Sequence, residues 1–164
     1  MPDLITHLVS TNLSVKIPGL FSNKVYKYYK EYRLFIFLGA IFPDLISKFP
    51  KYISMTLYNF TTPLHSPLVV LIATFIFTRF VYINEKRISF YTLAIFSMFH
   101  IFVDSFQKGI NPGYQIFFPF SLNRYGFNII SFKMYVYIFV IMLLVSVIIE
   151  FYFYIRNKKS ANRT

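Results

Sequence analysis

Long apolar runs dominate the pattern of this chain and predict helices that cross a membrane. The longest run, Met134 to Ile155, contains one charged residue, Glu150, and meets the length of about 20 apolar residues that a bilayer requires. The runs 67–83 and 88–106 are expected to span as well. A fourth run, 34–49, becomes polar towards its end, so it either crosses a thin region or ends inside the protein.

Three further segments predict a short helix, a segment on the membrane surface and a long loop. Residues 3–17 place apolar side chains at helical spacing and are followed by Pro18-Gly19, which predicts a short helix that ends there. Residues 21–33 mix lysines with tyrosines and are typical of a segment lying on the membrane surface. The glycine- and proline-containing stretch 107–133 predicts a long loop whose apolar patches pack over another part of the protein.

Composition supports the membrane as solvent, because 56% of the residues are hydrophobic and only 14% are charged. We therefore expect an all-α, multi-pass helical membrane protein of about four to five helices in one bundle. No repeat or linker divides residues 1–164, which predicts a single domain with a C-terminal transmembrane helix at 134–155. The N-terminus lacks the pattern of a removable signal peptide.

The net charge of +11 is distributed between the apolar runs, which favours membrane lipid rather than nucleic acid as the partner. If the first helix is at least partly inserted, alternate connections fall on opposite sides of the membrane. Eleven basic residues then lie on one side, in 16–33, 86–87 and 156–163, and five on the other, Lys48, Lys51, Lys108, Arg124 and Lys133. The richer side, including the C-terminus, should face the cytoplasm.

Histidine and aspartate supply the candidate chemistry. His100 and Asp104 are four residues apart in a helical run, so an imidazole and a carboxylate share one helix face. These groups suit zinc and other divalent ions, and the absence of cysteine leaves only nitrogen and oxygen ligands. Spacing alone fits a hydrogen bond between the two side chains equally well. Taken singly, Asp44 fits a turn or helix cap, and His65 an interfacial histidine.

The predicted topology brings these residues to the outer face, together with His7 from the first helix. Because that topology was counted from lysine and arginine alone, the convergence favours a metal site of His7, Asp44, His65, His100 and Asp104. Three ligands would leave an ion an open position for water, and five allow two ions that share a carboxylate. Asp3, by contrast, is expected to be a first-turn acid of the first helix.

The same residues carry a resemblance to a known family. The order His7, Pro43-Asp44, His65-Ser66, His100-x-x-x-Asp104 and then Phe118-Pro119-Phe120 resembles the YdjM-type membrane-bound, metal-dependent hydrolases over residues 1–121. That family is grouped with the zinc-dependent phospholipase C fold. The resemblance implies that Asp44, His65, His100 and Asp104 hold one ion, and that Asp104 bridges to a second ion held by His7.

The resemblance implies a hydrolase that acts on an ester or phosphoester of a lipid-like substrate through metal-activated water, with one or two zinc ions. Two departures from the family pattern are Ile46, where a further aspartate is common, and Tyr58-Asn59-Phe60, where an Arg-Gly run is common. The alternative is a non-enzymatic membrane protein that uses the same cluster as a structural or metal-transport site. A transporter would need ligands at staggered depths through the bilayer.

Overall fold

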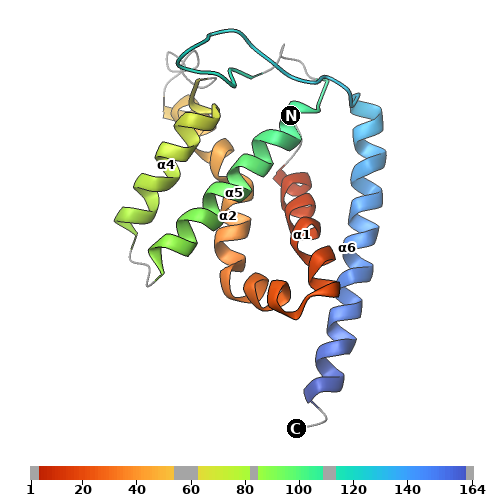
Figure 1. Ribbon diagram of the computed structural model, residues 1–164. Coiled ribbons are helices and arrows are strands. Elements are labelled where there is room, and N and C mark those ends of the chain that lie inside the picture. The colour runs from red at the N-terminus through yellow and green to blue at the C-terminus, as the bar shows by residue number, and fades with distance from the viewer. Residues whose placement is uncertain (1–3, 54–62, 82–84, 109–113, 162–164) are drawn as a thin grey trace.

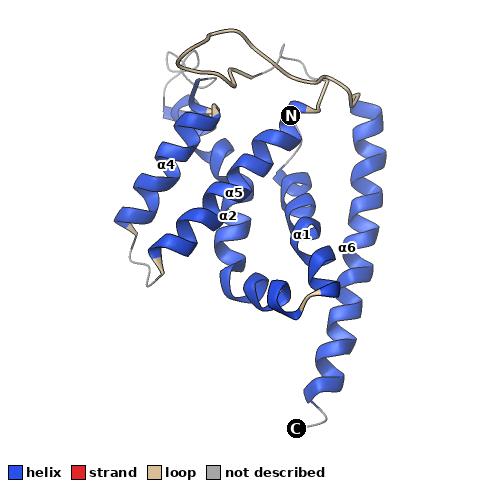
Figure 2. Ribbon diagram, viewed as in Figure 1, coloured by secondary structure: helices blue, strands red, loops and turns tan. Residues whose placement is uncertain are grey.

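The computed structural model describes residues 4–53, 63–81, 85–108 and 114–161, and it is built from helices (Figure 1, Figure 2). Within these residues it contains five named helices and no named strand, as the apolar pattern predicted. The helices are α1 (Leu4–Phe21), α2 (Asn23–Ile53), α4 (Pro67–Phe80), α5 (Lys86–Ser105) and α6 (Phe132–Ala161).

The first two helices are longer than the sequence pattern predicted. α1 continues through Pro18 to Phe21 instead of ending at Pro18-Gly19. α2 joins the basic and aromatic segment 21–33 to the apolar run 34–49 in one helix of 31 residues. Figure 1 shows its first turns running across the lower end of the molecule before the helix turns upwards beside α1. The surface-type segment is therefore the bent first part of a core helix.

The core lies where α1, α2 and α5 meet. Val15, Tyr29, Tyr32, Ile36 and Phe96 form its main apolar cluster. Gly39 of α2 lies directly against α5, because a Cβ atom at this position would lie 2.7 Å from the Phe96 Cβ and 3.0 Å from the Leu93 carbonyl oxygen. The missing side chain lets the two helix backbones approach closely, as small residues do between membrane helices.

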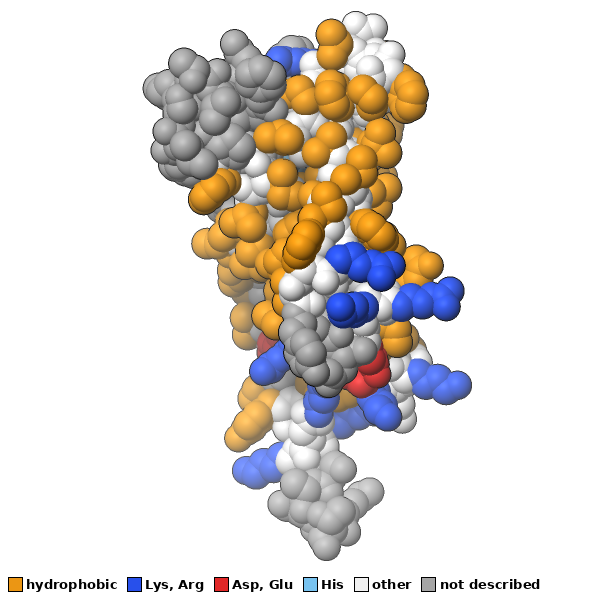
Figure 3. All heavy atoms as spheres, turned by 90° about the vertical axis from the view of Figure 1, so that its left-hand side faces the viewer, with side chains coloured by type: hydrophobic (Ala, Val, Ile, Leu, Met, Phe, Trp, Pro, Cys, Tyr) orange, Lys and Arg blue, Asp and Glu red, His pale blue; other side chains and the backbone are white. Residues whose placement is uncertain are grey.

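In the described part of the chain, two helices are long and apolar enough to cross a membrane, namely Lys86–Ser105 in α5 and Lys133–Lys158 in α6. α4 has 14 residues and is shorter than the predicted span 67–83. Its outer face is nevertheless apolar, and Figure 3 shows hydrophobic side chains along this side of the molecule with lysines and arginines gathered below them. Arg79, Lys86 and Arg87 line a hollow at that basic end.

A polar cluster attaches α6 to α1. The Lys16 ammonium pairs with the Glu150 carboxylate, and the Asn12 side chain donates to Ser146 Oγ at 3.2 Å. The Tyr29 hydroxyl donates to the side-chain oxygen Oδ1 of Asn12 at 3.0 Å, which connects α2 to the same cluster. Most large apolar side chains of α6 are exposed. This helix therefore meets the bundle through the polar seam and through an apolar cluster in which Ile149 and Phe153 pack with Leu13, and it presents most of its remaining surface outwards.

The loop after α5 passes over the upper end of the bundle (Figure 1). Most of its large apolar side chains are exposed, so the predicted packing of its apolar patches is not seen in the described residues. Backbone bonds hold its final part to the end of α5, since Phe127 N donates to the Ser105 oxygen and Ile129 N to the Phe106 oxygen. Tyr114 and Tyr125 exchange both backbone hydrogen bonds within the loop. Residues 109–113 lie outside the described part of this segment.

The two ends of the bundle differ in chemistry. The end of α1, the start of α2, the α4–α5 connection and the end of α6 share the lower end, where the Arg156 guanidinium bonds to Asn23 and the Tyr32 hydroxyl to Glu85 (Figure 1). These segments carry ten of the eleven basic residues that were expected on the cytoplasmic side, and the eleventh, Arg163, lies outside the described residues. The start of α1 and the ends of α2 and α5 meet at the upper end.

Gly39→Ala should destabilise the protein, because the added methyl group has no room between α2 and α5. We expect a loss of about 1–3 kcal/mol in the free energy of unfolding from overpacking, measured by thermal unfolding in detergent. Gly19→Ala is the matched control, since its Cβ would meet Tyr26 at an ordinary 3.6 Å. Equal melting temperatures for the two variants would show that the helices do not pack this closely.

Candidate metal centre

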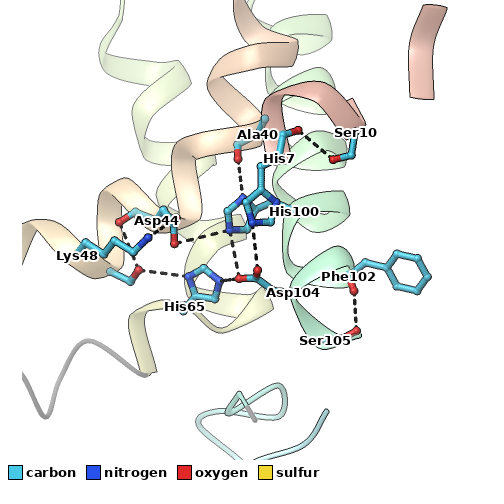
Figure 4. Close-up of polar contacts among 11 residues, drawn as sticks. His7, Ser10, Ala40, Asp44, Lys48, His65, His100, Phe102, Asp104 and Ser105 are labelled. Carbon is cyan, nitrogen blue, oxygen red and sulfur yellow. Dashed lines mark hydrogen bonds and ion pairs between the residues drawn. The ribbon is translucent and has the colours of Figure 1, made fainter. Parts of the chain in front are cut away.

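Four separate segments deliver five buried side chains to the upper end of the bundle (Figure 4). They are His7 from α1, Asp44 from α2, His65 just before α4, and His100 and Asp104 from α5. Four of them each offer one potential ligand atom, and these four atoms all lie within 4.8 Å of one another. The four residues are Asp44, His65, His100 and Asp104. The structure thus brings together all five residues that the sequence singled out, while Asp3 lies outside the described residues.

Asp104 is the centre of the cluster. Its Oδ2 lies 3.0 Å from His65 Nε2 and 3.4 Å from His100 Nε2, and its Oδ1 lies 3.1 Å from His7 Nε2. The side chain is only 2% exposed. Three imidazoles therefore surround one buried carboxylate, and its two oxygens face different histidines.

The orientation of His100 is fixed by a backbone group. Its Nδ1 lies 2.5 Å from the Ala40 carbonyl oxygen, and because a carbonyl can only accept, Nδ1 carries the proton. In the neutral ring the lone pair is then on Nε2, which faces Asp104 and, at 3.8 Å, Asp44 Oδ1. A lone pair aimed at two carboxylates is repelled unless a proton or a metal cation lies between them.

The local sequence of α2 explains why Ala40 is within reach. Gly39 brings α2 against α5. Four residues further on, Pro43 has no N–H to donate to the Gly39 carbonyl, so this turn of the helix lacks one internal hydrogen bond. The Ala40 carbonyl then accepts the bond from His100. A metal-binding histidine usually donates its other nitrogen to such an acceptor, which sets the tautomer and the ring direction.

Several buried atoms of the cluster lack hydrogen bonds within the part of the chain that the structure describes. They are both ring nitrogens of His7, Nε2 of His100 and Oδ1 of Asp104. The His7 and Asp104 atoms are close, but their geometry is not that of a hydrogen bond. Buried polar atoms are rarely left unpaired. Imidazole nitrogen and carboxylate oxygen are ligands for zinc and similar divalent ions, so these residues fit a metal.

Two further residues of α2 support the site and were not predicted. Ser47 Oγ lies 3.3 Å from His65 Nδ1, and Lys48 Nζ lies 2.5 Å from Asp44 Oδ2. Both follow Asp44 by three or four residues, which places them on its helix face. A serine and a lysine near the polar end of the run 34–49 carried no signal of this role by themselves. The adjacent Ser66 has no hydrogen bond to His65.

Tyr114 closes the site from the covering loop. Its ring centroid lies 5.0 Å from that of His65. Burial raises the pKa of the Tyr114 hydroxyl, and the neighbouring Asp104 carboxylate raises it further. The side chain therefore remains a neutral phenol that can donate a hydrogen bond beside the cluster. Its sequence context, a loop tyrosine in a chain with 14 tyrosines, gave no signal of this role.

Purified protein should contain stoichiometric divalent metal, and His100→Ala or Asp104→Asn should remove it, because each loses a ligand that faces several others. The measurement is metal content by mass spectrometry after gel filtration. Glu85→Gln, which changes an acid at the other end of α5, is the control and should retain the metal. An Asp104→Asn protein with the metal content of the wild type would contradict this assignment.

Ser47→Ala should weaken metal binding without abolishing it, since His65 loses the group that orients its ring. We expect a fall in metal affinity of about 10- to 100-fold, as is typical for such supporting groups, measured by competition with a chelating dye. Ser105→Ala is the control, because this buried hydroxyl donates to the Phe102 carbonyl of its own helix. Indistinguishable affinities for the two variants would show that Ser47 does not orient His65.

Of the comparisons with known proteins, one gives a match. No curated protein and no solved structure matches this chain. A protein-family model described as YdjM inner membrane protein matches residues 1–163. This match includes every residue of the cluster and the apolar helix α6, and it agrees with the resemblance drawn from the His and Asp motifs. Because it covers nearly all of the 164 residues, the chain belongs to the YdjM inner membrane protein family.

Proposed function

We propose that this protein is a membrane-bound, metal-dependent hydrolase that acts on an ester or phosphoester of a lipid-like substrate. The observation that supports this most directly is the orientation and hydrogen bonding of the His100 ring. Its Nδ1 proton is committed to Ala40, and its Nε2 faces Asp44 and Asp104 without a hydrogen bond in a fully buried position. A ring in this orientation can bind a cation through Nε2.

The residues divide into two groups around Asp104. Asp44, His65, His100 and Asp104 Oδ2 would hold one ion, preferably zinc, and His7 with Asp104 Oδ1 would hold a second. When bound, such an ion supplies Lewis acidity and lowers the pKa of a water molecule towards neutrality, which suits hydrolysis. Ser47 orients His65, and the neutral Tyr114 hydroxyl offers a proton donor beside the carboxylate.

The family and the two apolar helices indicate a membrane location. We propose a multi-pass arrangement in which the basic end of the bundle faces the cytoplasm and the metal centre lies near the outer face. Two observations support this orientation. The segments that carry most of the basic residues share one end, and the described His and Asp ligands lie at the other (Figure 1).

The same cluster could serve a structural or transport role. Transport would require ligands at successive depths, whereas all five candidate ligands converge at one end of the bundle (Figure 4). A purely structural ion has a closed set of ligands. The enzyme is distinguished from the structural alternative by turnover, because both would contain metal.

Hydrolysis of a short-chain phospholipid by the zinc-loaded protein should stop after chelation and return with added zinc. Asp104→Asn should lower kcat/KM by at least about 100-fold, because loss of a ligand should cost at least as much as loss of a group that only supports a ligand. Glu85→Gln should retain wild-type activity. Product release measured by mass spectrometry provides the readout. Unchanged hydrolysis by folded, metal-free protein would refute the proposed function, and bound metal without any turnover would favour the structural role.

A further inference from the structure

A groove between α1 and α2 leads to the metal centre from the side of the bundle. It has a volume of about 280 Å³ and is lined by Leu4, Ile41, Asp44, Leu45, Lys48 and Phe49. Leu4, Leu45 and Phe49 are 48%, 53% and 61% exposed, so apolar side chains form much of its open wall. Asp44 contributes both to this groove and to the cluster, which makes the groove a side entrance to the site.

Lys48 is the only cation that lines this groove among the described residues. Its ammonium group lies 2.5 Å from Asp44 Oδ2, and its side chain is 38% exposed. The other oxygen of Asp44 is directed towards His100. One carboxylate thus lies between a lysine in the entrance and the ligand set inside the bundle (Figure 4).

A divalent ion and Lys48 compete for Asp44. An ion held by the cluster would use the negative charge of Asp44 and would repel the nearby ammonium group. The lysine would then be released towards the groove, where its side chain is already partly exposed. An ammonium group on a flexible stem is a common ligand for phosphate.

We propose that Lys48 binds the phosphate of an anionic lipid whose acyl chain lies along Leu4, Leu45 and Phe49. This inference rests on the proposed function and specifies its substrate class. The groove offers apolar contact along its wall and one positive charge at its inner end, which matches the tail and head group of such a lipid. A phosphate bound by Lys48 would lie beside Asp44, which belongs to both the groove and the cluster.

Lys48→Met should change two affinities in opposite directions. Affinity for zinc should rise about threefold to tenfold, because Asp44 loses a competing cation. Affinity of the zinc-loaded protein for short-chain phosphatidic acid should fall about tenfold, the effect of one charged hydrogen bond, while affinity for the matching phosphatidylcholine should change little. Calorimetry in detergent measures both, and inorganic phosphate serves as a third ligand that should bind far more weakly than the lipid.

Lys108→Met is the matched control, since Lys108 is an exposed lysine at the same end of the bundle that does not line the groove, and it should leave both affinities unchanged. Lys48→Arg should preserve phosphatidic acid binding. If Lys48→Met lowers both affinities, or leaves phosphatidic acid binding unchanged, the role of Lys48 is refuted while the metal centre stands. Wild-type protein that binds no zinc would refute the metal centre and the lipid site together.

Discussion

The buried carboxylate of Asp104 is the constraint on which the arrangement of the helices depends. A charge that is almost inaccessible to water costs several kcal/mol unless opposite charges or donors surround it. Histidines from α1, from the start of α4 and from its own helix face Asp104, but of these only His65 is hydrogen-bonded to it, so a bound cation would complete its surroundings. The three segments must converge at one point, and the loop that carries Tyr114 then covers that point. Packing of the upper end and formation of the site are therefore one event, to which a bound ion would add its own free energy.

The close approach of α2 and α5 is what makes this convergence possible. Gly39 removes the side chain that would separate the helices, and the next residue, Ala40, presents the carbonyl that orients His100. One turn later Asp44 reaches the cluster, and Ser47 and Lys48 follow on the same face. A single stretch of α2 thus sets the distance between helices, the tautomer of a histidine, one carboxylate ligand and the entrance to the site.

The five clustered residues and the helical fold could be predicted because their signals are independent of detailed packing. The lengths of the apolar runs predicted α5 and α6. The scarcity of His and Asp, the topology expected from Lys and Arg, and the family resemblance together predicted the cluster of His7, Asp44, His65, His100 and Asp104. The continuity of α2 from Asn23 to Ile53 was not predicted, because the basic and aromatic segment 21–33 and the apolar run 34–49 have different local patterns. The roles of Ser47 and Lys48 depend on side-chain contacts with His65 and Asp44 that the sequence pattern does not specify. The role of Tyr114 could not be predicted for another reason, because nothing in a loop sequence specifies which helix end the loop will cover.

α6 has a role separate from the chemistry. It contributes none of the clustered His and Asp residues. It joins the described bundle through an apolar cluster of Leu13, Ile149 and Phe153 and through the polar seam of Lys16, Asn12, Ser146 and Glu150 on α1 and α6. Such a polar seam fixes the position of a helix whose other faces are apolar, because separating it in hydrocarbon would leave a lysine and a glutamate unpaired. Lys16 lies more than two turns of α1 beyond His7. The helix that carries one metal-site histidine therefore also carries the anchor, so the site is held at a set depth relative to the longest apolar helix in the described structure.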